Sequence, residues 1–220
     1  MRQMMGLINI LLVDDHAIVR EGYRSLLNKQ PSFTIVAEAE SGEEAYVLFR
    51  KHQPDLVILD LSLPGKGGLA TLIQIRQLDP KAKVLVFSMH QNPSMAKKVI
   101  EAGAKGYVTK SSAPAELIQA VMDVVKGGLA ISEDIARAIA LDSLHGKSAI
   151  VNKLSTREYE ILRMLVEGKS KADIAETLSI SIKTVSNAYY IIKSKLEVKT
   201  DLELMHAALQ ARVVSVSDYL

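Results

Sequence analysis

A single stretch decides the fold: Ile8-Asn9-Ile10-Leu11-Leu12-Val13-Asp14-Asp15, in which a largely apolar run ends in two carboxylates. Two further runs have the same form, since 56–59 ends at Asp60 and 107–109 ends at Lys110. Short apolar runs are typical of buried parallel strands. If the three strands belong to one parallel sheet, their C-terminal ends meet in one crevice, which is where such sheets bind ligands.

Strand-like runs alternate with stretches of helical period through the first half of the chain. The expected strands are 8–13, 33–37, 56–59, 84–87 and 106–108. A helix with apolar residues every three or four positions follows each of them, and the last begins near Pro114 and stops at Gly127-Gly128. This pattern predicts an α/β doubly wound five-stranded parallel sheet over residues 1–128.

The remaining sequence loses the strand pattern. Residues 129–153 combine a helical patch with a polar stretch, and we interpret them as a linker that contains a helix. Residues 154–220 show repeated helix starts, with a capping box at Ser155 and Glu158 and further caps at Ser170 and Ser181. We expect an all-α domain of four helices at about 156–167, 171–178, 182–196 and 201–211.

Composition excludes several classes of protein. The chain of 220 residues contains no cysteine, which excludes disulfides, thiolate zinc sites and cysteine nucleophiles. No apolar run approaches the roughly 20 residues that a membrane helix needs, so we expect a cytoplasmic protein without a membrane partner. The net charge of +2 is small, and any basic surface for nucleic acid must therefore be local.

The strand-end residues suit phosphoryl transfer. Three carboxylates and one ammonium in one crevice repel each other unless a cation joins them, and their hard oxygen ligands suit Mg²⁺. We expect Asp60 to act as the nucleophile, with Asp15, Asp60 and the Ser62 backbone carbonyl holding the metal and Asp14 acting through water. Lys110 would pair with the phosphate, and the hydroxyl of Ser88 could donate to a phosphate oxygen.

Simpler interpretations exist for single residues. Any one of these carboxylates could be a solvated strand-end charge, and the hypothesis depends on their combination. The glycine-rich segment 65–68 lacks the ending of a P-loop, so we interpret it as a turn into the third helix. His16 and His90 have no partners at metal-ligand spacing and are expected to be surface or packing residues.

These motifs resemble the receiver domain of bacterial two-component response regulators. The similarity covers about 7–126 and rests on Asp14-Asp15, the turn 60–65, Ser88, Tyr107 and Lys110. It implies that a sensor histidine kinase phosphorylates Asp60, that Ser88 moves towards the phosphate and that Tyr107 turns inward behind it. A packing role for Tyr107 remains the alternative.

The helix expected at 182–196 carries the candidate nucleic-acid contacts. Val185, Tyr189, Ile192 and Leu196 recur at three- and four-residue steps and should face the core. We expect an outward set that could meet base edges in a major groove, namely Thr184, Ser186, Asn187 and Tyr190. Asn187 could pair with adenine, while Lys183, Thr184 and Lys193 would hold phosphates.

This second domain is similar to the LuxR-type helix-turn-helix domain, through 154–158, 168–170, 173–175, 183–185 and 195–196. A receiver joined to such a domain resembles the NarL/FixJ branch of response regulators, which implies binding to paired promoter half-sites in double-stranded DNA as a homodimer. The chain departs from the family at Ser186 and Ala188, where family members often have lysine and histidine, and in its two adjacent tyrosines.

The sequence therefore predicts a transcription regulator, not an enzyme. One rival is an aspartyl-phosphate hydrolase, but such enzymes place a second acid two residues after the nucleophile, where this chain has Ser62. A second rival is a DNA-independent regulator whose helical domain binds protein, and the charge pattern alone also fits a small helical bundle with a solvated lysine face. Salt-dependent binding to duplex DNA would separate this rival from a DNA-binding regulator, because phosphate contacts give a steep salt dependence.

Overall fold

A computed structural model describes residues 7–65, 67–89, 91–145, 153–178, 180–211 and 213 of the chain. The chain divides into two compact units, Met1–Ala138 and Ile139–Leu220. Residues 146–152, which include most of the polar part of the expected linker, lie outside the described residues. The functional limits 1–128, 129–153 and 154–220 stay a prediction.

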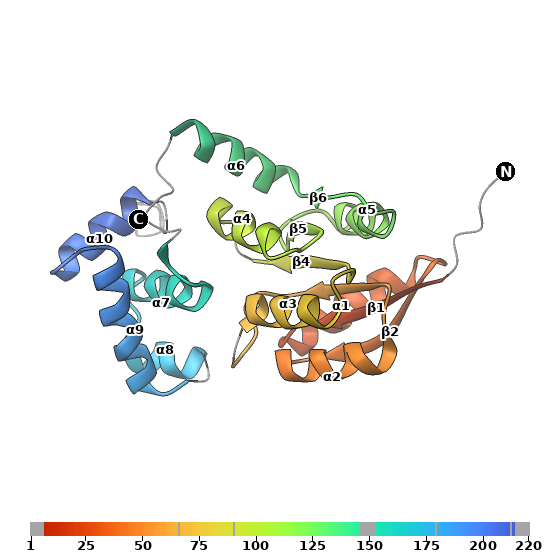
Figure 1. The fold of residues 1–220 in the computed structure, drawn as a ribbon, viewed down its shortest axis with the longest axis horizontal. Coiled ribbons are helices and arrows are strands. Elements are labelled where there is room, and N and C mark those ends of the chain that lie inside the picture. Colours follow the sequence, from red (N-terminus) through yellow and green to blue (C-terminus); the bar gives the residue numbers. More distant parts are fainter. Residues whose placement is uncertain are drawn as a thin grey trace. The chain divides into compact units, whose positions relative to one another are not determined.

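The first unit is built on a parallel sheet, as the alternating sequence pattern predicts (Figure 1). The strand order is β2-β1-β3-β4-β5-β6, and every neighbouring pair is parallel. The order reverses at β1, so the ends of β1 and β3 flank the switch point where ligands bind in such sheets. The strands are β1 (Ile8–Val13), β2 (Phe33–Ala39), β3 (Leu56–Leu59), β4 (Val84–Ser88), β5 (Gly106–Thr109) and β6 (Ala130–Ile131).

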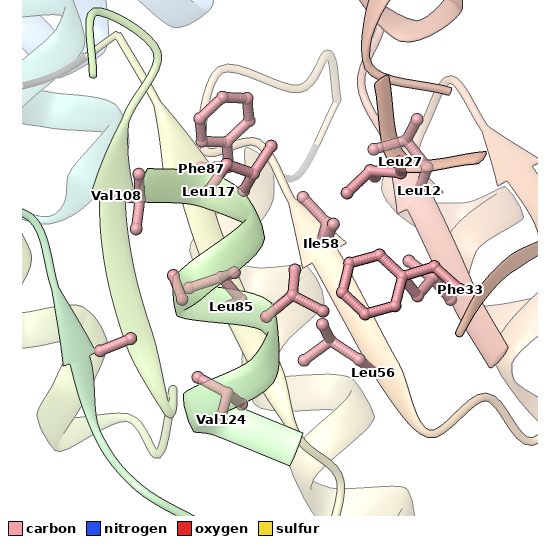
Figure 2. Packing of buried hydrophobic residues seen from close by; sticks show 14 of the residues in the cluster. Leu12, Leu27, Phe33, Leu56, Ile58, Leu85, Phe87, Val108, Leu117 and Val124 are labelled. Carbon is pink, nitrogen blue, oxygen red and sulfur yellow. The ribbon is translucent and has the colours of Figure 1, made fainter. Parts of the chain in front are cut away.

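Helices α1 (Ala17–Asn28) and α5 (Pro114–Val125) cover one face of the sheet. Alternate strand residues such as Leu12, Ile58 and Leu85 point to this face and form one core with Leu27 and Val124 (Figure 2). The opposite strand residues, including Val57 and Val86, are also fully buried. Burial on both faces explains why the strands are continuous apolar runs. The other helices of the α/β pattern are α2 (Gly42–His52), α3 (Gly67–Leu78) and α4 (Pro93–Glu101).

The expected number of five strands is wrong, because a sixth strand of two residues joins the edge of the sheet. β6 pairs with β5, and the amide of Ser132 donates to the carbonyl of Tyr107 at 3.0 Å. Gly106 makes this approach possible, since a Cβ there would lie 2.6 Å from the carbonyl oxygen of Ala130. The sheet therefore extends into the segment that the sequence assigned to the linker, and two residues are too few to show a strand pattern.

Helices make up the second unit within the described part of the chain. α6 (Glu133–His145) crosses from the first unit into the second, so the second unit contains more than the four helices that were expected. Each expected helix ends one residue earlier than predicted, because the next residue is its C-cap. These helices are α7 (Thr156–Val166), α8 (Lys171–Thr177), α9 (Ile182–Lys195) and α10 (Asp201–Gln210). None of the described helices is both long and apolar enough to cross a bilayer.

Candidate functional site

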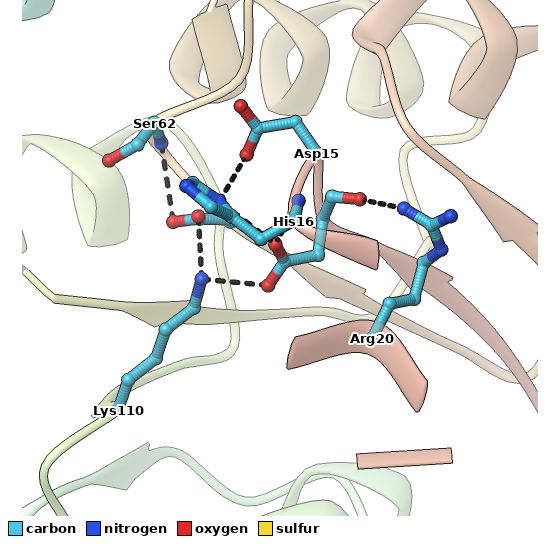
Figure 3. Close-up of polar contacts among 7 residues, drawn as sticks. Asp15, His16, Arg20, Ser62 and Lys110 are labelled. Carbon is cyan, nitrogen blue, oxygen red and sulfur yellow. Dashed lines mark hydrogen bonds and ion pairs between the residues drawn. The ribbon is translucent and has the colours of Figure 1, made fainter. Parts of the chain in front are cut away.

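Three of the predicted residues meet at the C-terminal edge of the sheet. Asp14 follows β1, Asp60 follows β3 and Lys110 follows β5, and the Lys110 ammonium lies 2.7 Å from Oδ2 of each carboxylate (Figure 3). All three side chains are buried, with exposed fractions of 6% for Lys110 and 3% for each aspartate. One ammonium therefore bridges two carboxylates that are separated by 46 positions in the chain's numbering and brought together by the sheet.

Asp15 completes the acidic cluster. One ligand atom from each of Asp14, Asp15, His16 and Asp60 lies within 4.8 Å of all the others. The Asp15 side chain is 30% exposed, and its Oδ1 lies 2.8 Å from His16 Nδ1. Burial raises the pKa of the Asp15 carboxyl, the positive charge of His16 opposes this rise, and the charges of Asp60 and Asp14 add to it.

The donor set fits a hard divalent cation. Asp15 Oδ1 is buried, and apart from its ion-pair contact with His16 Nδ1 it has no hydrogen-bond donor among the described residues. Asp14 Oδ1 accepts from the His16 amide at 2.9 Å, and Asp60 Oδ1 accepts from the Ser62 amide at 3.2 Å. Carboxylate oxygens at this density are the ligands that Mg²⁺ prefers, and a single lysine leaves the cluster with excess negative charge.

Two cations support the cluster, and sequence reasoning found one of them. For Lys110, burial acts to lower the pKa of the ammonium, but the charge of Asp60 and the hydrogen bonds to both aspartates outweigh burial and raise this pKa. Arg20 on α1 was missed. Its Nη1 donates to the backbone carbonyl of Asp14 at 2.6 Å, and its Nε donates to Glu38 at 3.2 Å. The sequence position of Arg20 does not indicate its contact with the Asp14 carbonyl, because this contact depends on how α1 packs against the sheet.

The turn after Asp60 is fixed by a close backbone approach. The amide of Gly68 donates to the carbonyl of Leu61 at 3.0 Å, which folds the chain back at the start of α3. A Cβ at Gly68 would lie 2.1 Å from the Asp60 carbonyl oxygen and 2.5 Å from Leu61 Cα. The glycine-rich segment is thus the entry to α3 that the sequence predicts, although Lys66 itself lies outside the described residues.

Ser88 and Tyr107 lie on the strands beyond β3. Both side chains are fully buried, Ser88 at the end of β4 and Tyr107 within β5. The amide of Lys110 donates to the carbonyl of Ser88 at 2.9 Å, so the two strand ends are bonded to each other. The burial of Tyr107 fits both a packing role and the inward position of a switch, and its role stays a prediction.

The strand that ends at Lys110 is also bonded to α6. The buried hydroxyl of Thr109 donates to Asp134 Oδ2 at 2.7 Å, in the first turn of α6. Burial acts to raise the pKa of Asp134, but its hydrogen bonds, including the one from Thr109, lower this pKa overall. No sequence pattern pairs these residues, because they are 25 positions apart and α6 was assigned to a linker.

The second candidate site is the exposed side of α9. Val185 and Ile192 are fully buried, as predicted, while Leu196 and Tyr189 are half-buried. Ser181 is the N-cap of the helix, and its side chain accepts from the amide of Thr184. The predicted contacts Lys183, Thr184, Asn187 and Tyr190 are exposed, and Ser186 and Lys193 are half-buried.

Lys193 is more enclosed than the sequence suggests. Its side chain is 14% exposed, and its ammonium lies 3.0 Å from Asp201 Oδ1 on α10 and 3.0 Å from the Tyr189 hydroxyl. Tyr189 Oη also donates to Asp201. The phosphate contact that the sequence analysis assigns to Lys193 stays a prediction.

The sequence analysis also considered His16 and His90. His16 is exposed beside Asp15, and His90 lies outside the described residues.

Two family models match the chain. The model for the response regulator receiver domain matches residues 10–122, and the model for bacterial regulatory proteins of the luxR family matches residues 152–208. Among curated proteins, the response regulator UvrY of Escherichia coli (strain K12) is 36% identical over 93% of this chain and 94% of its own length. The transcriptional activator protein ExaE of Pseudomonas putida is 38% identical over 96% of this chain and all of its own length.

The similar solved structures are also response regulators. A LuxR-family two-component response regulator from Aurantimonas sp. SI85-9A1 is 51% identical, with a TM-score of 0.62, over 63% of this chain and 99% of that one. RcsB from Salmonella enterica serovar Typhimurium, solved bound to promoter P1flhDC with the phosphomimetic BeF3-, is 29% identical with a TM-score of 0.64. That similarity covers 91% of this chain and 97% of RcsB.

Proposed function

The chain belongs to the response regulators that join a receiver domain to a LuxR-type DNA-binding domain, and we propose that phosphorylation of Asp60 controls its binding to promoter DNA. It is a DNA-binding regulator of transcription. The observation that carries the proposal is the Lys110 ammonium, 2.7 Å from both Asp14 and Asp60 at the switch point of the sheet. This arrangement presents a carboxylate nucleophile beside a cation that can hold phosphate oxygens.

The phosphoryl step uses the Asp60 carboxylate. An Asp60 oxygen attacks the phosphorus of a phosphohistidine, so that an O–P bond forms and the P–N bond breaks. The electron pair of the P–N bond stays on the kinase imidazole nitrogen, which takes up a proton from water as the imidazole leaves. Lys110 then moves from pairing carboxylates to pairing the new phosphate, and the Ser62 amide, 3.2 Å from Asp60 Oδ1, keeps the acceptor oriented. We assign a sensor histidine kinase as the donor, and Ser62 in place of a second acid supports a regulator over a hydrolase.

Asp15, Asp60 and the Ser62 backbone carbonyl would hold Mg²⁺, with Asp14 contributing through water. Bound there, the ion would supply positive charge against the oxygens of the transferring phosphoryl group. Oδ1 of Asp15 is buried and, apart from its contact with His16, has no hydrogen-bond donor among the described residues, which supports this assignment. Within the protein, Arg20 donates to the Asp14 backbone carbonyl and holds that segment in place, and Gly68 allows the close backbone approach by which the chain turns after Asp60.

The switch converts the new charge into a change of state. A phosphate adds about −1.5 to −2 charges at the crevice. Ser88 and Lys110 lie on adjacent, mutually bonded strand ends, so a conformation in which both contact the phosphate is favoured by phosphorylation. A complete switch requires a differential affinity of about 5.5 kcal/mol. We assign Tyr107, buried in β5 behind these strand ends, as the residue whose packing separates the two states.

The output is the exposed face of α9. Lys183 and Thr184 would contact phosphates near its start, and Asn187 and Tyr190 would meet base edges. The relative RcsB has been solved as two dimers bound to two parallel DNAs, which supports a homodimer of this chain on paired half-sites. Because its partner is promoter DNA, we place the protein in the cytoplasm.

The direct test is DNA affinity as a function of phosphorylation. The full chain is titrated with promoter duplexes, recovered by genomic footprinting, in Mg²⁺ with and without acetyl phosphate. We expect tighter, steeply salt-dependent binding with acetyl phosphate, and no response in Asp60→Asn. Asp55→Asn is the matched control, since Asp55 is an exposed carboxylate at the opposite end of β3. Equal affinity in all arms contradicts phosphorylation control, and the absence of salt-dependent binding contradicts DNA recognition.

A further inference from the structure

The outward face of α9 contains an aromatic side chain among polar ones. Lys183, Asn187, Tyr190 and Ser194 are spaced by four, three and four positions, so they lie along one face, and all four are exposed. Val185 and Ile192 are buried on the opposite side. Tyr190 is 66% exposed, which leaves most of an apolar ring in water on the face that the proposed function assigns to DNA.

The Tyr190 ring rests on Tyr189. The two rings make an edge-to-face contact, with centroids 5.2 Å apart and an angle of 74° between the planes. The Lys171 ammonium on α8 lies 4.4 Å from the centroid of Tyr189 and 5.9 Å from that of Tyr190. Edge-to-face and cation–π contacts favour defined ring orientations. Tyr190 is therefore exposed to solvent, but its ring is held in place by contacts with Tyr189 and Lys171.

Tyr189 also has partners on α9 and α10. Its hydroxyl donates to Asp201 on α10, and Lys193 lies 3.0 Å from that hydroxyl and 5.0 Å from the ring centroid. Three helices thus converge on one phenol ring. A side chain that is ordered before binding loses less conformational entropy on binding, so this support favours Tyr190 as a contact residue over an unconstrained surface aromatic.

We propose that Tyr190 determines part of the operator sequence by packing against the C5-methyl group of a thymine in the major groove. This inference rests on the proposed function, since it requires α9 to lie in that groove. Thymine is the standard base that presents a methyl group there, and apolar side-chain atoms recognise it by contact. Asn187, close to one turn away on the same face, is suited to the neighbouring adenine.

The test removes the methyl group alone. Duplexes selected from a random library by the full chain give the preferred site, and each thymine is then replaced by deoxyuridine. We expect about fourfold weaker binding at one thymine per half-site, which corresponds to one buried methyl group. Tyr190→Phe keeps this difference and Tyr190→Ser abolishes it. Leu202→Ser is the matched control, because Leu202 is an 82% exposed apolar residue of α10, and it keeps the difference.

A second measurement uses the unaltered protein, so that loss of binding by Tyr190→Ser cannot obscure the result. The critical thymine is replaced by 5-iododeoxyuridine, the complex is irradiated, and the cross-linked residue is identified by mass spectrometry. Cross-linking to Tyr190 supports the proposal. A cross-link to another residue, or a methyl dependence that Tyr190→Ser retains, overturns it while DNA binding stands. Absence of any salt-dependent binding to duplex DNA instead overturns the proposed function, and this inference with it.

Discussion

Replacing Lys110 by methionine should destabilise the first unit strongly, and Mg²⁺ should restore much of the loss. The Lys110 ammonium is the cation that lies 2.7 Å from both Asp14 and Asp60, whose side chains are 3% exposed. With His16 left aside, the cluster contains three carboxylates and one ammonium, and removal of the ammonium leaves three carboxylates without that cation. The variant therefore concentrates unpaired negative charge in a buried site.

The magnitude follows from the geometry. At an effective dielectric constant of about 20, one contact at 2.7 Å is worth about 6 kcal/mol before desolvation is counted. Part of this energy is lost because burying the charges is itself unfavourable, and breaking a buried pair by removing one partner typically costs about 3–5 kcal/mol. We expect a loss in that range for the free energy of unfolding in a buffer with a chelator.

The assay is urea unfolding of the full chain at neutral pH, followed by circular dichroism, in EDTA and in excess Mg²⁺. Mg²⁺ should stabilise Lys110→Met more than the wild type, because a ligand that binds the folded state stabilises it and the variant site is more acidic. Lys105→Met is the control, since Lys105 is exposed just before the same strand, and should change stability by less than about 0.5 kcal/mol. A loss below about 1 kcal/mol for Lys110→Met, or a loss that Mg²⁺ leaves unchanged, would refute the reasoning.

Two further changes test the site and the second unit. Gly68→Ala should cost at least about 1–3 kcal/mol and reduce phosphorylation of Asp60, because the added Cβ would meet the Asp60 carbonyl at 2.1 Å; unfolding and phosphorylation assays on the same sample check both. Glu158→Gln should cost about 1 kcal/mol near pH 7, since glutamine can still complete the capping box with Ser155 but loses the charge pair with Lys195 at 2.6 Å. Burial acts to raise the pKa of Glu158, but hydrogen bonds from Lys195 and Ser155 lower this pKa overall. The cost should therefore be fully present above the ordinary pKa of 4.5 and should be lost as pH falls below 4.5 and through the lowered pKa of the folded state. A pH series of urea midpoints that shows a constant cost contradicts this.

The parts of the fold that local pattern determines were predictable. Strands β1 and β3 have the expected bounds, because full burial on both faces leaves continuous apolar runs with charged ends. The cap residues Ser155, Ser170 and Ser181 fixed the starts of three helices for the same local reason. Strand β6 was not predicted, because it has only two residues and because its pairing with β5 requires the close backbone approach that Gly106 allows.

The site shows the same division between local and tertiary information. Asp14, Asp15, Asp60 and Lys110 could be brought together by topology, since parallel strands place their ends at one edge. The contact of Arg20 with the Asp14 carbonyl, and that of Thr109 with Asp134, depend on the placement of α1 and α6 against the sheet. Likewise, the position of Tyr189 follows from partners on α8 and α10, which helical periodicity cannot reveal.

The most direct test of the central claim is to locate the phosphoryl group. The full chain is incubated with acetyl phosphate and Mg²⁺, trapped by borohydride reduction of the acyl phosphate, digested and analysed by mass spectrometry. The account predicts modification at Asp60 that disappears in EDTA and in Asp60→Asn. Modification at another carboxylate, or none at all in a chain that unfolds cooperatively under the same conditions, would contradict it.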